Sequence, residues 1–262
     1  MSYLVICSVA LFVSGLTLFS GFGLGTLLMP AFALFFPVEV AVAATAAVHL
    51  ANNIFKVALV GRKADFKIVF KFALPAAIAA MVGALMLNYI AAVDPIASYS
   101  LWGRSCMITT VKLVIAGLIL LFAISEFVPQ LEKLSFDPKN IPVGGALSGF
   151  FGGLSGHQGA LRTAFLIRAG LQKEVFVGSM VVSAVVVDIS RLIVYGSTFF
   201  GRDFMILRAG GGIGLVLAGS LAAFLGAFIG SRLLKKITMR AIQTMVGVML
   251  FLLAIALGIG LV

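Results

Sequence analysis

Two glycine-rich turns lie inside apolar stretches of the chain, and the second carries residues that could bind a small anion. His157 and Gln158 stand in the turn at 153–160, and Arg162 follows it. An arginine inside an apolar segment is costly and is therefore a functional candidate, and its guanidinium can bind a planar anion through two parallel hydrogen bonds. His157 could bind the same ligand or carry a coupled proton. The alternatives are that Arg162 extends to the membrane surface from a shallow hairpin and that His157 only bonds to backbone.

Each turn, 21–26 and 153–160, stands just before a short helical arm. The free N–H groups and the positive dipole end at a helix N-terminus favour an anion, and glycine lets the backbone approach a ligand closely. The alternative is that the glycines only allow helices to pack tightly. The substrate-binding residues predicted from the two turns are Gly23, Gly25, Thr26, Gly156, His157, Gln158, Gly159 and Arg162.

A second group of polar residues recurs at helical spacing on two further apolar segments. His49, Asn52 or Asn53, and Lys56 share one face of the segment 38–60. On the segment 173–197, Asp188 and Arg191 can pair, which lowers the cost of burying either charge. Lys56 and Arg191 lie near ends of their segments, so we predict that this group lines two vestibules or takes part in coupling. The alternative for both is snorkelling to the interface.

Several kinds of chemistry have no support in the sequence. There is no hydrolytic triad with a credible base, no Cys/His metal cluster and no phosphate-binding loop. The two cysteines, Cys7 and Cys106, stand apart in largely apolar surroundings. We therefore predict a protein that is not an enzyme and that needs no metal and no cofactor.

The composition indicates which solvent surrounds these residues. Of 262 residues, 62% are hydrophobic and 11% are charged, whereas a soluble domain carries about 25% charged residues. The net charge of +10 has no soluble basic domain to carry it. We therefore assign it to cytoplasmic loops, which are rich in lysine and arginine, and predict no nucleic-acid partner.

The apolar stretches define an all-α polytopic membrane protein, since about 20 apolar residues suffice for a spanning helix. Two stretches, 3–36 and 141–170, are broken by the glycine turns, and such discontinuous helices need protein or water around them. The unbroken helices are predicted at 38–60, 66–92 and 104–127 in a first half, 1–127, and at 173–197, 203–235 and 238–261 in a second half, 141–262, with a linker at 128–140.

The halves align, with Gly23 over Gly156, Asn53 over Asp188 and Lys56 over Arg191. Eight single spans would divide the basic loop residues eight against seven. If each broken stretch enters and leaves by the same face, twelve share one side, namely Arg62, Lys63, Lys67, Lys71, Lys133, Lys139, Arg168, Lys173, Arg232, Lys235, Lys236 and Arg240, and three lie opposite, namely Arg104, Arg202 and Arg208. The positive-inside rule then predicts two inverted repeats with both termini outside.

The chain resembles the TauE/SafE family of sulfite and organosulfonate exporters over nearly its whole length. The likeness is carried by Gly21-Phe22-Gly23-Leu24-Gly25 with Pro30, Ala43-Ala44-Thr45 with Asn52-Asn53, Gly149-Phe150-Phe151-Gly152-Gly153-Leu154-Ser155-Gly156, and Gly178-Ser179. The resemblance implies transport of small sulfur-containing anions across a bacterial cytoplasmic membrane. The chain departs from the family pattern at Thr163, His157-Gln158, Arg162 and Asp188, and these departures indicate proton coupling through Asp188 or His157.

We therefore predict a secondary transporter, and specifically an exporter, of sulfite or a short organosulfonate such as sulfoacetate. Its partners are the anion, the bilayer and a coupling proton or other ion, with a homodimer as a further expectation. Alternating access would rock one half against the other around a central site. The alternatives are a passive anion channel and a non-transporting membrane assembly partner.

Overall fold

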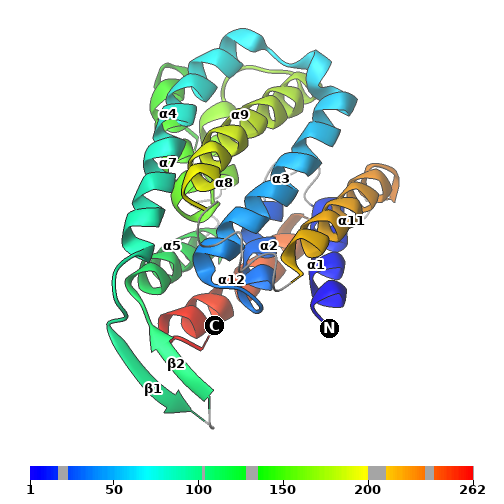
Figure 1. The fold of residues 1–262 in the computed structure, drawn as a ribbon. Coiled ribbons are helices and arrows are strands. Elements are labelled where there is room, and N and C mark those ends of the chain that lie inside the picture. Colours follow the sequence, from blue (N-terminus) through cyan, green and yellow to red (C-terminus); the bar gives the residue numbers. More distant parts are fainter. Residues whose placement is uncertain (17–22, 102–103, 128–134, 200–210, 234–238, 262) are drawn as a thin grey trace.

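The computed structural model describes residues 1–16, 23–101, 104–127, 135–199, 211–233 and 239–261 (Figure 1). Gly21, most of the predicted linker 128–140, the loop with Arg202 and Arg208, and part of the basic loop 232–240 lie outside the described residues. The helices of the first half are α1 (Ser2–Leu16), α2 (Leu24–Ala33), α3 (Val38–Val60), α4 (Phe66–Ala91) and α5 (Thr110–Phe127). Those of the second half are α7 (Ile141–Ser155), α8 (Gly159–Leu166), α9 (Lys173–Phe199), α11 (Gly212–Leu233) and α12 (Met239–Gly258), and short 3-10 turns occupy Gly61–Lys63 and Pro138–Asn140.

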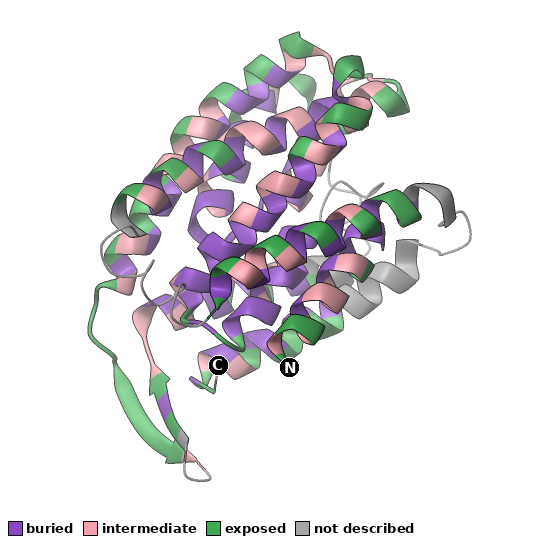
Figure 2. Ribbon diagram, turned by 45° about the vertical axis from the view of Figure 1, so that its right-hand side comes forward, coloured by how far each residue is buried: buried purple, intermediate pink, exposed green. Residues whose placement is uncertain are grey.

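The helices have the length and surface of membrane spans. Four segments of the described chain are long and apolar enough to cross a bilayer, namely Val38–Lys63, Phe66–Ala91, Lys173–Ser197 and Gly212–Gly230. Helix α4 illustrates the surface: Phe70, Leu74 and Ile78 are exposed, while Phe72 and Ala76 are buried. Figure 2 shows exposed residues along the outer sides of the helices. Because many of the exposed residues are large and apolar, the solvent of this surface is lipid. The chain is a multi-pass membrane protein with a mainly helical fold.

Both overlong stretches are broken at the predicted glycines. Helix α1 ends at Leu16 and α2 begins at Leu24, after Gly23 with φ 119°. Helix α7 ends at Ser155, and Gly156 follows in the left-handed conformation with φ 83° before α8 begins at Gly159. Glycine adopts positive φ without the steric cost that a side chain brings. The backbone at each break therefore requires the residue type found there.

The two halves pack on each other in a reciprocal pattern. Helix α1 packs on α11, and its counterpart α7 packs on α4, while α3 packs on α9 and α5 packs on α12. Exchanging α1 with α7, α3 with α9, α4 with α11 and α5 with α12 gives the same set of packed pairs. The arrangement puts the third helices, α3 and α9, side by side near the middle of the molecule (Figure 1).

Glycines bring the interleaved helices into backbone contact. A Cβ atom on Gly149 of α7 would lie 2.0 Å from the carbonyl oxygen of Ala76 in α4, and one on Gly226 of α11 would lie 2.0 Å from that of Leu11 in α1. Such distances leave no room for a methyl group. For these two glycines the tight-packing role weighed in the sequence analysis is the one that the structure shows.

We expect Gly149→Ala to lower the free energy of unfolding by about 1–3 kcal/mol, because the new methyl group must push α4 and α7 apart. The matched control is Gly117→Ala in α5, where an added Cβ meets nothing within 4 Å. There alanine should instead stabilise the helix by up to about 1 kcal/mol. The measurement is unfolding of the purified protein in mild detergent. Equal effects at both positions would contradict backbone contact between α4 and α7.

A β-hairpin corrects the predicted helix at 104–127. Strands β1 (Ala97–Leu101) and β2 (Arg104–Ile108) pair antiparallel with Ala97 opposite Ile108, and helix α5 begins only at Thr110. Serines alternate with larger side chains here, a pattern of period two that suits a strand. A hydropathy window long enough for a spanning helix merges this segment with α5. Among the described residues the hairpin is the one departure from the all-helical prediction.

Candidate anion site

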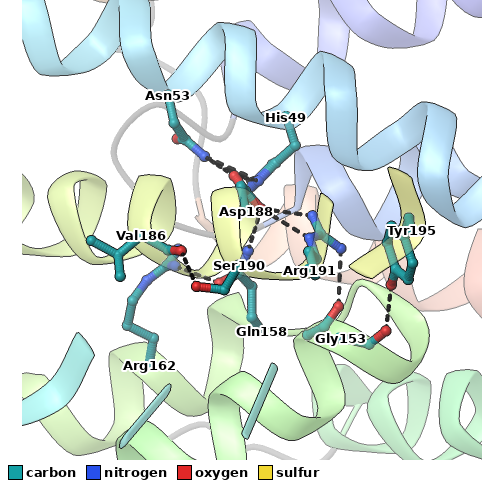
Figure 3. A network of polar contacts seen from close by, with 11 residues as sticks. His49, Asn53, Gly153, Gln158, Arg162, Val186, Asp188, Ser190, Arg191 and Tyr195 are labelled. Atoms are coloured by element: carbon teal, nitrogen blue, oxygen red, sulfur yellow. Dashed lines mark hydrogen bonds and ion pairs between the residues drawn. The ribbon is translucent and has the colours of Figure 1, made fainter. Parts of the chain in front are cut away.

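A fully buried carboxylate, Asp188 in α9, organises the centre of the molecule (Figure 3). Its Oδ1 accepts from Arg191 Nη2 at 2.7 Å, from Arg191 Nε at 3.1 Å and from Gln158 Nε2 at 2.9 Å. Its Oδ2 accepts from Asn53 Nδ2 at 3.1 Å. A buried charge needs partners of this kind, because it has lost its hydration. Asp188 thus joins α9, α3 and the turn before α8.

His49 of α3 also contacts Asp188, and this contact determines which ring nitrogen of a neutral His49 carries the proton. His49 Nδ1 lies 2.7 Å from Asp188 Oδ2. A carboxylate only accepts, so the proton of the neutral ring is on Nδ1. The separation of 3.0 Å between Asn53 Nδ2 and His49 Nδ1 then joins two donors and is no hydrogen bond. The remaining ring nitrogen, Nε2, is the one that can take up a second proton.

Arg191 connects this cluster to the break after α7. Its Nη1 donates to the carbonyl oxygen of Gly152 at 2.9 Å, and the Tyr195 hydroxyl donates to that of Gly153. The last carbonyls of a helix lack partners within the helix, and Tyr195 supplies a donor to that of Gly153. Arg191 adds a second hydrogen bond to the Gly152 carbonyl, which also accepts from the Gly156 N–H at 3.0 Å. Arg191 lies one turn before Tyr195 on α9, which directs both side chains to the same helix end.

The two glycine breaks, distant in sequence, meet at this cluster. A Cβ on Gly25, in the first turn of α2, would lie 3.2 Å from the carbonyl oxygen of Gly156 and 3.6 Å from His49 Cδ2. Gly25 therefore touches the other break through backbone, with His49 beside it. The structure brings together the two turns that the sequence predicts to face each other.

Gln158 positions Arg162 at the start of α8. Gln158 Oε1 accepts from Arg162 Nη1 at 3.1 Å while its Nε2 donates to Asp188, and its backbone carbonyl accepts from Ser148 Oγ at 2.8 Å. This orientation of the amide follows from its two partners. Arg162 is 2% exposed, so it does not extend to the membrane surface as the alternative supposed.

His157 points away from Asp188. Its Nδ1 lies 3.0 Å from the carbonyl oxygen of Ser155, and its ring stacks on Phe122 of α5 with 5.1 Å between centroids. Because a carbonyl only accepts, Nδ1 carries the proton, which leaves Nε2 as an acceptor with no partner among the described residues. His157 therefore makes the hydrogen bond to backbone that was the alternative to a ligand role. Its Nε2 remains able to accept a hydrogen bond from another group.

The remaining predicted residues lie in the same region. Gly23 and Gly159 are buried at the starts of α2 and α8, and Thr26 is half-buried in the first turn of α2. Lys56 is 7% exposed and Arg191 is fully buried. Neither side chain snorkels to the interface, because both are buried, and their role in vestibules or coupling stays a prediction.

Sequence reasoning missed several polar residues of this centre. Tyr195, Ser148 and Ser14 contribute hydrogen bonds, and Thr45 is buried on α3. The spacing of Tyr195 after Arg191 and of Thr45 before His49, four residues in each case, could have identified two of them as neighbours on a helix face. The serines carry no such signal, since a serine in an apolar helix usually bonds its own backbone.

The comparisons with known proteins agree with this arrangement. The family model described as Sulfite exporter TauE/SafE matches residues 4–257. No curated protein and no solved structure matches the chain. Because the family match extends over nearly all of the apolar helices and both breaks, the chain belongs to the TauE/SafE family, whose members are membrane transporters of the sulfite exporter type.

Proposed function

We propose that this protein is a secondary transporter that exports a small sulfur oxyanion, either sulfite or a short organosulfonate such as sulfoacetate, across a bacterial cytoplasmic membrane. The observation that carries the proposal is the meeting of the two helix breaks beside a buried cationic cluster. Among the described residues that are buried, Lys56, Arg162 and Arg191 are positive and Asp188 is negative. A buried cluster with more positive than negative charge favours an anion.

The helix ends at the two breaks add to this preference. Helices α2 and α8 begin at the breaks, and their first intrahelical bonds are Leu27 N to Gly23 O and Arg162 N to Gln158 O. The N–H groups ahead of these bonds have no acceptor within their own helix. Together with the dipole they favour negative charge. The proposed site therefore comprises the first turns of α2 and α8 with Arg162.

Alternating access would use the duplicated architecture. We propose that the two halves are inverted repeats with both termini outside, as loop charge indicates, and that they rock around the site. For coupling we assign a proton to His49, because Asp188 holds Nδ1 while the ring lies beside Gly25. A proton on Nε2 would change the charge next to the anion, so that protonation of His49 and anion binding are linked.

Ligand binding and transport test this proposal. Sulfite or sulfoacetate at about 100 times its Kd should stabilise the purified protein by about 2.7 kcal/mol, because only the folded state binds it. In proteoliposomes, the same anion should accumulate against its gradient when a proton gradient is imposed. Matched controls are sodium chloride at equal ionic strength and liposomes without protein.

Two outcomes would contradict the proposal. Downhill flux that a proton gradient never drives uphill would identify a passive anion channel. The absence of both stabilisation and flux with any sulfur oxyanion would remove the substrate assignment and leave an assembly partner as the better interpretation.

A further inference from the structure

Helix α3 carries a row of buried hydrogen-bond donors that are separate from the shell of Asp188. Thr45, Asn52 and Lys56 fall within about 40° of one another around the helix axis, because 3.6 residues make one turn. They are 1%, 0% and 7% exposed. His49 and Asn53 lie on the adjoining side of the helix and bind Asp188. We call Thr45, Asn52 and Lys56 the donor row.

The donor row has donors without acceptors. Asn52 Oδ1 accepts from Ser14 Oγ at 3.2 Å, which fixes the amide so that Nδ2 points elsewhere. Asn52 Nδ2 and Thr45 Oγ1 have no partner among the described residues, and Lys56 makes no hydrogen bond or ion pair with them. An unpaired buried donor is costly, and an unpaired buried charge more so. A ligand rich in oxygen atoms would satisfy this row.

Asn52 and Lys56 are close enough to act on one ligand. They stand four residues apart on α3, a spacing that puts their Cβ atoms about 5–6 Å apart on one face. The guanidinium of Arg162 is near enough to repel the Lys56 ammonium. The two buried cations therefore give this part of the interior a positive potential, with Asn52 one helical turn from Lys56 on α3.

The buried charges indicate how much negative charge the ligand carries. Three buried cations, Lys56, Arg162 and Arg191, and one buried anion, Asp188, leave a sum of +2 among the described residues when both histidines are neutral. A bound dianion brings the net charge to zero, a monoanion leaves it at about +1, and a zwitterion leaves it at about +2. Charges held at low dielectric interact strongly, so the difference between these ligands should be large.

We propose that Asn52 Nδ2 and Lys56 Nζ bind oxygen atoms of the transported anion, and that the bound form is a dianion. The inference rests on the proposed function and narrows its substrate class to sulfite as SO3²⁻ or a sulfocarboxylate. It adds two binding residues on α3 to the turns at 21–26 and 153–160. Asn52 supplies a neutral donor, and Lys56 supplies one of the two uncompensated charges.

Calorimetric titration of purified protein with two ligands of similar size tests the inference. Sulfoacetate is a dianion at pH 7.5 and 2-hydroxyethanesulfonate is a monoanion. The wild type should bind sulfoacetate at least about tenfold more tightly. Lys56→Met should reduce this preference to about twofold or less, whereas Lys56→Arg should keep it. Asn52→Leu should weaken both ligands by about tenfold, since one hydrogen bond to a charged group is lost.

The matched control is Lys71→Met on α4, where the side chain is exposed; its ratio of affinities should equal that of the wild type. A structural role for Lys56 would change stability without changing the ratio. Equal affinity of the wild type for both ligands, or an unchanged ratio in Lys56→Met, would overturn this inference while the proposed function stands. Failure of the wild type to bind any sulfur oxyanion would overturn both.

Discussion

Asp188→Leu should lower the free energy of unfolding by about 3–5 kcal/mol, the range for removing one partner of a buried ion pair. The loss arises because Arg191 would remain fully buried with its carboxylate gone. Gln158, Asn53 and His49 would lose an acceptor as well. Thermal unfolding in mild detergent, together with the yield of monodisperse protein, measures the effect.

The double variant Asp188→Leu/Arg191→Leu separates charge from packing. When both partners of a buried pair become apolar, the cost is often small, so the double variant should recover at least half of the loss. Recovery will be incomplete because Arg191 also donates to Gly152. Glu174→Leu is the control on the same helix, and its exposed side chain should matter by less than about 1 kcal/mol. Equal loss in the single and double variants would contradict an ion-pair role for Asp188.

The local features of this fold were predictable because they depend on near neighbours. Hydropathy over windows of spanning length identified α3, α4, α9 and α11, because lipid requires long apolar segments. Glycine clusters identified the two breaks, because positive φ at Gly23 and Gly156 suits glycine alone. The Asp188–Arg191 pair followed from its spacing of three residues on one helix.

The features that remained hidden depend on contacts between distant segments. His49 and Asp188 are 139 residues apart, and no local pattern shows that they touch. The orientation of the His157 side chain could not be predicted for the same reason. Its ring stacks on Phe122 of α5, which is distant in sequence. The positions of Lys56 and Arg191 near helix ends indicated exposure, but α9 packs on α3, α4 and α7 along its length. Depth in a membrane protein therefore cannot be read from distance to a helix end alone.

The reciprocal packing gives the breaks their common location. Helices α1 and α7 each end near a break, and each is held against the fourth helix of the other half, α11 and α4 respectively, through glycine contacts. Helix α3 packs on α11, and helix α9 packs on α4 and α7. The polar faces of α3 and α9 therefore meet close to the two breaks. This packing thus explains why residues far apart in the sequence, Asn53 and Asp188 among them, share one hydrogen-bonded cluster.

Arg162→Gln should lower sulfite or sulfoacetate transport by at least about 10- to 100-fold, the loss expected when a charge-assisted hydrogen bond is removed from a buried site. Arg162→Lys keeps the charge without the planar fork and should lose less. Initial rates in proteoliposomes, normalised to the amount of inserted protein, measure both variants. The Gln158 contact to Arg162 Nη1 is lost in each, so the comparison isolates the charge.

Ligand-free stability distinguishes this role from a purely structural one. Asp188 attracts the Arg162 guanidinium, whereas Arg191 and Lys56 repel it. Removing the charge therefore loses one attraction and relieves two repulsions, while it costs the contact to Gln158. We therefore expect the ligand-free unfolding free energy of Arg162→Gln to stay within about 1 kcal/mol of the wild type, the usual scale for one neutral hydrogen bond. The stabilisation by ligand, about 2.7 kcal/mol at 100 times the wild-type Kd, should fall to about 1.4 kcal/mol or less at the same concentration. An arginine that only held α8 in place would show the reverse, a large loss of ligand-free stability with ligand stabilisation intact, because its charge would serve the fold and its absence would leave the anion site unchanged.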